Sequence, residues 1–402
     1  MRWVIVNTDY PEFLHALYAA SPSLHHASCE EQLRVRRESL FGVADFYSSN
    51  LRELGHEAWE VYANNVPLQR AWARENGMRA APRVGRRGIE PPPVQARQQS
   101  RLATARHLAG RALERLGVKA LSLGGILAAQ LAHYRPDVIL NQAIGEVDED
   151  LLRVAWPHAL LVGQIASPLP TNVDFRCYEL VVSSLPNFVA HFRGIGVASE
   201  LNRLAFEPRV LSRLGPRTPS VDVSFVGSIS PAHAARIAWL EQLCRELGVD
   251  VWGPGVELLP KDSAIRAHHR GQAWGLEMYE TLRVSKIALN SHIDVAAGHA
   301  NNMRLFEATG AGTLLITDHQ QDLHEIFKPG REVVSYRTSQ ECVALVRRYL
   351  VDDREREAIA QAGQARTLRD HTYRARMAEL AELCSHYVAK MRREPRAPKG
   401  RQ

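Results

Sequence analysis

Short apolar runs alternate along the chain with longer segments in which apolar residues recur at helical spacing, and this alternation predicts a parallel α/β fold. We expect strands at residues 3–6, 58–62, 137–140, 160–162, 180–183, 223–226, 249–252, 286–290 and 313–317. Helical periodicity covers residues 30–54, 96–116, 121–134, 232–247, 302–309, 343–351, 354–368 and 374–391, and another helix ends near residues 279–284.

The two series of strands and helices meet at residues 213–220, where Gly215, Pro216 and Pro219 favour a linker. This boundary predicts an N-terminal α/β domain at residues 1–213 and a C-terminal one at residues 214–372. Residues 76–99 contain glycines and three consecutive prolines, so we expect a loop or an insertion there. A helix at residues 373–391 has one apolar face for packing. A basic tail at residues 392–402 follows, which we expect to be disordered.

The charge of the chain is unevenly distributed. The 402 residues include 50 Lys and Arg against 44 Asp and Glu, for a formal net charge of +6. Residues 70–119 hold twelve bases and three acids, and residues 390–402 hold six bases and one acid. The rest of the chain is therefore acidic on balance.

The sequence lacks the usual signals for export or a membrane. The first strand ends at Asn7, too early for the apolar part of a signal peptide, and the longest uncharged run, residues 120–134, is too short to span a bilayer. Five scattered cysteines without CxxC spacing predict neither a disulfide framework nor a zinc site. We expect a cytoplasmic protein that needs no metal.

The densest chemical signal is residues 290–330, NSHIDVAAGHANNMRLFEATGAGTLLITDHQQDLHEIFKPG. A loop of small residues precedes Asn301 and Asn302, either of which is a natural N-cap for the following helix. A helix start after such a loop offers free amides and a positive dipole end to a phosphate. Glu307, inside the helix, can accept from ribose hydroxyls, and Arg304 shares its face. An ordinary surface ion pair between Arg304 and Glu307 explains the pattern equally well.

These residues resemble the C-terminal domain of the CgeB-like (spore-maturation-type) glycosyltransferases, relatives of the family 4 (group 1) nucleotide-sugar glycosyltransferases. The block from Arg304 to Gly312, RLFEATGAG, carries most of the resemblance, supported by VSFVGSISPAHAARIAWLEQL, VDVWGPG and YSSNLRELGHEAWEVYANN. The resemblance covers nearly the whole chain outside residues 76–99 and the tail. It implies the GT-B fold, in which two Rossmann-like domains face a cleft and the C-terminal helix packs back towards the N-terminal domain.

The same resemblance implies a metal-independent glycosyltransferase of the EC 2.4 class that needs no cofactor and takes a nucleotide diphosphate sugar as donor. It assigns the ribose hydroxyls to Glu307, and the diphosphate to the amides of Ala300, Asn301 and Asn302. Further donor candidates are Gly227 and Ser228 near the phosphates, Arg236 as a counter-charge, Trp252 and Gly253 at the base, and Asn290 and Arg304. A solvated Arg236 and a Trp252 buried in the core are equally good explanations of those two residues.

One position departs from the family pattern. Family 4 relatives carry two glutamates eight positions apart, whereas His299 stands eight positions before Glu307. His299 is therefore a catalytic candidate in place of a glutamate, and the choice between retention and inversion of configuration stays open.

Acceptor-side residues are expected after the strands of the N-terminal domain, because open α/β sheets bind ligands at the carboxyl ends of their strands. The candidates are Asn7, His25, His26, Gln142, Glu146, Gln164 and Asn187, with Asp9 as the leading general base of an inverting enzyme. A retaining enzyme needs no such base, and an adjacent pair of histidines in a polar loop is often only solvated.

Three functions compete at this stage. A glycosyltransferase requires an acceptor, whereas an epimerase or hydrolase of the same fold acts on a sugar nucleotide without one. A nucleic-acid-binding protein would use residues 70–119, but that segment has no aromatic residue after Trp72 and matches no nucleic-acid module. The basic segment also suits an anionic or lipid-linked acceptor and peripheral contact with the inner face of a membrane. A solvated arginine-rich insertion explains it equally well.

Overall fold

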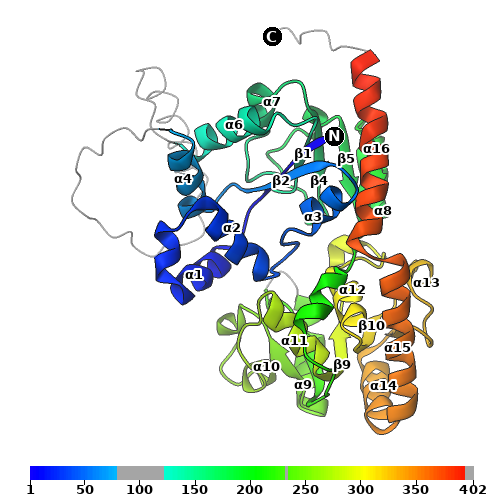
Figure 1. Ribbon diagram of the computed structural model, residues 1–402. Helices are drawn as coiled ribbons and strands as arrows, with labels where there is room; N and C mark the ends of the chain where they lie inside the picture. Colours follow the sequence, from blue (N-terminus) through cyan, green and yellow to red (C-terminus); the bar gives the residue numbers. More distant parts are fainter. Residues whose placement is uncertain (79–121, 231–233, 394–402) are drawn as a thin grey trace.

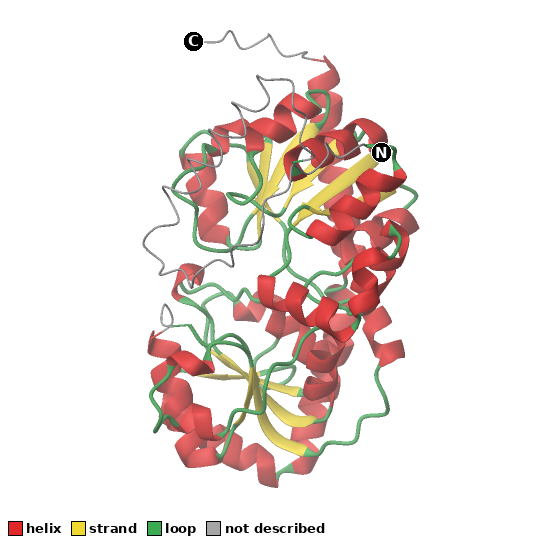
Figure 2. Cartoon of the chain, turned by 90° about the vertical axis from the view of Figure 1, so that its left-hand side faces the viewer, coloured by secondary structure: helices red, strands yellow, loops and turns green. Residues whose placement is uncertain are grey.

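The computed structural model describes residues 1–78, 122–230 and 234–393, which form two sheets in which all paired strands are parallel. The first sheet has the order β2-β1-β3-β4-β5-β6, with β1 Arg2–Asn7, β2 Glu57–Tyr62, β3 Val138–Asn141, β4 Leu160–Gln164, β5 Leu180–Ser183 and β6 Ser199–Leu201. The second has the order β11-β10-β9-β7-β8, with β7 Val221–Val226, β8 Asp250–Trp252, β9 Ser285–Asn290, β10 Leu314–Asp318 and β11 Val334–Tyr336. Figure 2 shows the sheets in two lobes, each surrounded by helices.

The helical segments lie between the strands. In the N-terminal lobe they are α1 Pro11–Ala20, η1 Pro22–His26, α2 Cys29–Glu38, α3 Phe46–Glu53, α4 Val66–Glu75, α6 Leu123–Tyr134, α7 Glu149–Ala155, η2 Phe175–Cys177, α8 Pro186–Gly194 and η3 Pro208–Arg213. In the C-terminal lobe they are α9 Ala234–Leu247, η5 Val256–Leu258, α10 Ala264–Ala267, α11 Leu276–Arg283, η6 Asp294–Ala296, α12 Met303–Gly310, α13 Leu323–Ile326, α14 Ser339–Val351 and α15 Asp353–Asp370. The last helix is α16, Tyr373–Arg393.

The C-terminal sheet is buried on both faces, and alternate residues of a strand enter different cores. Ile287 and Leu289 of β9 belong to the core that holds side chains of α9 and α14. Ala288, between them, belongs to the core that holds side chains of α11 and α12. The pair α9 and α14 therefore covers one face of the sheet, and α11 and α12 cover the other.

Helix α16 returns to the N-terminal lobe (Figure 1), where it contacts α3 and β4. Arg374 at its start pairs with Glu53 at 2.8 Å, and Arg392 near its end pairs with Asp137 at 3.1 Å. This arrangement confirms that the C-terminal helix packs back towards the N-terminal domain.

The end of the N-terminal lobe, just before η3, is also fastened to the C-terminal helices. The Phe206 amide donates to the His371 carbonyl at 2.8 Å, and the Phe206 carbonyl accepts from the Tyr373 amide at 3.0 Å. Its ring lies against Gly310, where an added Cβ would come within 2.4 Å of the ring. Gly310 is therefore needed because the end of α12 approaches Phe206, and not only because a glycine ends a helix.

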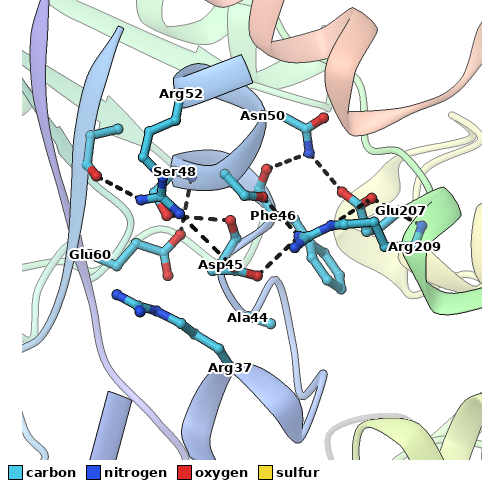
Figure 3. A network of polar contacts seen from close by, with 12 residues as sticks. Arg37, Ala44, Asp45, Phe46, Ser48, Asn50, Arg52, Glu60, Glu207 and Arg209 are labelled. Carbon is cyan, nitrogen blue, oxygen red and sulfur yellow. Dashed lines mark hydrogen bonds and ion pairs between the residues drawn. The ribbon is translucent and has the colours of Figure 1, made fainter. Parts of the chain in front are cut away.

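A buried polar network joins α3, β2 and η3 in the N-terminal lobe (Figure 3). Asn50 donates to Glu207 at 2.7 Å, and Arg209 pairs with Asp45 at 3.0 Å. Glu60 on β2 accepts from the Ser48 amide at 3.3 Å. Burial raises the pKa of Glu60 to about 7.

Several expected elements differ from the observed ones. The helix expected at residues 30–54 is broken into α2 and α3, because Leu40, Gly42 and Ala44 have positive φ angles that no α-helix accepts. Helices α1, α4, α7, α8, α10 and α13 and strands β6 and β11 were not expected. Most of the expected loop at 76–99, the expected helix at 96–116, the bulk of the basic segment 70–119 and nearly all of the tail 392–402 lie outside the described residues.

Candidate functional site

The carboxyl ends of β9 and β10 position the loop that leads into α12. Asn302 is the N-cap of α12, and its side chain accepts from the Leu305 amide at 3.2 Å, as predicted. Asn290, the last residue of β9, accepts from Asn302 at 2.8 Å and donates to Thr317 at 2.9 Å. The Asn290 side chain therefore holds the start of α12 in place through contacts within the domain.

Glu307 lies in α12 with only 4 % of its surface exposed. Its Oε2 lies 2.9 Å from Nη1 of Arg304, so the ion pair considered from the sequence is present, but both side chains are largely buried and the pair does not lie on the surface. Burial raises the pKa of Glu307, and the Arg304 charge partly opposes this. The buried Nε of Arg304 has no hydrogen-bond partner in the described part of the chain. The pair thus keeps an unused donor at the start of α12.

The loop before α12 differs from the expected phosphate cradle. Asp322 accepts from the Ala300 amide at 2.6 Å and lies 2.9 Å from Nδ1 of His299. The Ala300 amide is therefore already used, which corrects its assignment to a diphosphate. The half-exposed Asn301 and Asn302 remain candidates. His299 has a carboxylate partner that orients its ring, a contact that was not expected.

The turns after β7 and β8 pack backbone against backbone. The Gly227 amide donates to the Trp252 carbonyl at 2.9 Å. Gly253 has φ of +144°, and a Cβ there would lie 2.0 Å from the Gly227 oxygen, so this position requires glycine. Arg236 donates to the Ser228 carbonyl at 2.7 Å, and Trp252 is half-buried against the core. Arg236 is thus placed beside the Gly227–Ser228 turn, whereas packing already explains Trp252.

Polar side chains follow the carboxyl edge of the N-terminal sheet. Gln142 donates to Gln164 at 2.9 Å, and Gln164 donates to the Tyr47 hydroxyl at 2.7 Å. Several buried atoms along this edge have no partner among the described residues: Asn7 Nδ2, Gln142 Oε1, Ser184 Oγ, Asn187 Oδ1 and Asn202 Nδ2. Buried polar atoms are normally satisfied, so this row indicates a ligand-facing edge.

The two lobes meet at this edge. Asn187 at the start of α8 donates to the Val295 carbonyl at 3.2 Å. Val295 and Ala296, in the loop after β9, pack into a core of the N-terminal lobe. The loop that ends at α12 therefore reaches the carboxyl edge of the N-terminal sheet.

Asp9 does not serve that edge as a free carboxylate. Arg36 binds both of its oxygens, with Nη2 to Oδ1 at 2.6 Å and Nε to both oxygens at 3.0 Å. The Asp9 side chain is only 1 % exposed. Both acceptor atoms are occupied by a buried cation, so the geometry speaks against Asp9 as a general base.

Three other acceptor-side candidates lie on the surface. His25 and His26 are exposed in η1, where the His25 ring stacks on Tyr18 at 4.6 Å between ring centroids. Glu146 is exposed in the turn after β3. None of the three has a contact in the described part of the chain that joins it to Gln142 or Gln164.

Sequence reasoning missed a histidine–carboxylate pair in the C-terminal lobe. Nδ1 of His292, just after β9, lies 2.7 Å from Oδ1 of Asp318, the last residue of β10. Both follow the carboxyl ends of adjacent parallel strands, so the rule applied to the N-terminal sheet could have found them.

Metal and membrane features are not evident in the part of the chain that the structure describes. Among those residues, no group of three or more His, Cys, Asp and Glu is arranged to hold a metal ion. None of the described helices combines the length and the apolar character needed to cross a membrane. The five cysteines are free thiols.

Comparisons with known proteins fit this architecture. A family model described as "Glycosyl transferase-like" matches residues 236–382. A sucrose-phosphate synthase from Thermosynechococcus elongatus is similar in structure, with a TM-score of 0.56 at 10% identity over 96% of this chain and 99% of that one. AviGT4, a glycosyltransferase involved in avilamycin A biosynthesis, has a TM-score of 0.53 at 15% identity over 97% and 99%. Anabaena HepE in complex with UDP and glucose has a TM-score of 0.53 at 11% identity over 96% and 100%.

At these identities the structural similarity establishes the fold. The chain has the α/β GT-B fold, with two Rossmann-like domains, as the sequence predicted. The CgeB-like subtype is not distinguished by these comparisons. No curated protein matches the sequence.

Proposed function

We propose that this protein is a glycosyltransferase that takes its sugar from a nucleotide diphosphate sugar held by the C-terminal domain. The single observation that carries the proposal is α12, which starts at the carboxyl end of β9 and brings together the N-cap Asn302, the buried Glu307 and the Nε of Arg304, which has no partner among the described residues. The match of residues 236–382 to a glycosyl transferase-like family supports it.

The nucleoside would be held by Glu307. A carboxylate accepts from both hydroxyls of a ribose, and Arg304 favours its charged form despite burial. The diphosphate would lie at the amides of Asn301 and of the N-cap Asn302, just before α12, where the helix dipole favours negative charge. Arg236, the counter-charge expected from the resemblance, lies on α9 and lines a different pocket of this domain.

The sugar would face His299. Asp322 fixes the orientation of the His299 ring, so one ring nitrogen can be presented in a defined direction. This position holds a histidine rather than a glutamate, so both retention and inversion of configuration are compatible with the site.

The acceptor would bind along the carboxyl edge of the N-terminal sheet. Gln142, Gln164 and Tyr47 form a connected polar group there, and a polyhydroxy acceptor would satisfy the unpartnered atoms beside them. An anionic or lipid-linked acceptor, peripheral contact with a membrane through residues 70–119, and a cytoplasmic location stay predictions.

A panel of nucleotide sugars, each with and without a mixture of acceptors, tests the proposal when products are read by mass. We expect a product whose mass is that of an acceptor plus one glycosyl unit. A sugar nucleotide that is isomerised or hydrolysed at the same rate without acceptor would contradict a transferase and favour an epimerase or hydrolase of this fold.

A further inference from the structure

A pocket of about 470 Å³ lies in the C-terminal lobe, at the carboxyl ends of β9, β10 and β11. Its walls come from the starts of α9 and α14, the two helices that cover one face of the sheet. Glu307 lies on α12, which covers the other face. The pocket is therefore separate from the proposed nucleoside site.

A buried histidine lines this pocket with one nitrogen unused. The His292 side chain is 2 % exposed, and its Nε2 has no hydrogen-bond partner in the described part of the chain. Its Nδ1 lies 2.7 Å from Asp318, which fixes the orientation of the ring. A buried ring nitrogen without a partner needs a ligand group to satisfy it.

The Asp318 carboxylate contacts the His292 ring and neighbouring donors. Its oxygens accept from the His292 amide at 3.1 Å, from Gln320 at 2.7 Å and from Thr317 at 3.2 Å. Burial alone would raise the pKa of Asp318, but the hydrogen bonds from His292 and Gln320 lower it below its ordinary value. Asp318 therefore stays ionised, and its oxygens are occupied by these donors.

The pocket also gathers positive groups. Arg236 and Arg337 line it, and neither has a carboxylate within ion-pair distance among the described residues. Ser339 and Gln340 occupy the first two positions of α14, where the amides have no acceptor within the helix. The exposed Asp294 is the other acidic residue of the wall.

We propose that this pocket is a binding site for a phosphate group, distinct from the diphosphate of the donor. Its oxygens would accept from Arg236, Arg337 and the first amides of α14, and His292 Nε2 would complete the site. With Nδ1 directed at Asp318, Nε2 accepts from a P–OH group when the ring is neutral and donates to a P–O⁻ oxygen when the ring is protonated. A phosphate that carries one proton satisfies both states, whereas a neutral sugar leaves two arginines without a counter-charge.

Isothermal titration of the full chain with inorganic phosphate tests the site. Loss of a charge-assisted hydrogen bond should weaken phosphate binding about tenfold or more in His292→Gln, and several-fold in Arg337→Gln. Arg331→Gln is the matched control, because Arg331 is an exposed arginine at the other end of β11 and does not line the pocket. Arg337 is exposed too, so its variant should keep the wild-type melting temperature and decides the question if His292→Gln fails to fold.

The same titration is repeated with UDP in excess and with glucose in place of phosphate. We expect unchanged phosphate binding in the presence of UDP and no binding of glucose. No binding of phosphate, an equal affinity in Arg337→Gln and wild type, or displacement of phosphate by UDP would each overturn the proposal.

Discussion

The burial of Glu60 predicts how the free energy of unfolding depends on pH. Its side chain lies under α3, and the Tyr62 hydroxyl is 2.6 Å from both Glu60 Oε2 and the Ala44 carbonyl. One hydroxyl proton serves one acceptor at a time, so a protonated Glu60 would supply the second proton of this contact. Burial raises the pKa of Glu60 from an ordinary 4.5 to about 7.

The sign of the effect follows from that direction. A carboxyl group whose pKa is raised by folding holds an extra proton in the folded state, so its contribution to stability is fully present below pH 4.5 and is lost as the pH rises through about 7. A shift of about 2.5 pKa units corresponds to about 3 kcal/mol, because each unit is about 1.4 kcal/mol. Glutamine has nearly the same shape and does not ionise. Glu60→Gln should therefore gain about 3 kcal/mol relative to wild type between pH 4.5 and pH 8.

Urea unfolding followed by tryptophan fluorescence at several pH values from 4.5 to 8 measures this difference. Glu57→Gln on the same strand is the matched control, because Glu57 is exposed and its replacement should change stability by less than about 0.5 kcal/mol at any pH. If the free-energy difference between Glu60→Gln and wild type is the same at pH 4.5 and pH 8, the buried carboxyl group ionises as in water and the reasoning is refuted.

Two further substitutions test the packing around the site. Gly310→Ala should destabilise the fold by about 1–3 kcal/mol, because a Cβ would meet the Phe206 ring at 2.4 Å. Gly194→Ala, with open space around it, is the control and should change the melting temperature little. Equal melting temperatures of the two variants would contradict the close approach of α12 to Phe206. Asp9→Asn should lower the unfolding free energy by about 3–5 kcal/mol, because it leaves the buried Arg36 without its partner. If Asp9→Asn unfolds like wild type but has lost transferase activity, Asp9 acts as a general base rather than as the partner that stabilises Arg36.

The sheets were largely predictable because parallel strands buried on both faces are continuous apolar runs. The expected strands at residues 3–6 and 286–290 fall within β1 and β9. The three-residue strands β6 and β11 were missed, whereas β8, of the same length, was predicted from the apolar residues at 249–252. The break between α2 and α3 depends on positive φ at Leu40 and Ala44, which are not residues that favour such a turn.

Site residues were predictable from the sequence where a rule depends on one element alone, such as the N-cap of a helix or the residues that follow a strand. The N-cap Asn302 and the polar residues after the N-terminal strands came from local rules. Contacts between residues far apart in the sequence could not be predicted in this way. Asp9 forms an ion pair with Arg36, and the Ala300 amide donates to Asp322. His292 and Asp318 were missed because their pairing requires two strand ends to be considered together.

Binding of nucleoside diphosphates tests the assignment of α12 most directly. The melting temperature is measured with UDP and GDP for wild type, for Glu307→Gln and for Glu382→Gln, an exposed glutamate on α16 that serves as control. Ligand at one hundred times its dissociation constant should stabilise wild type and the control by about 2.7 kcal/mol, and Glu307→Gln should lose most of this. No stabilisation of the wild type by any nucleoside diphosphate, or full stabilisation of Glu307→Gln, would contradict a donor site at α12.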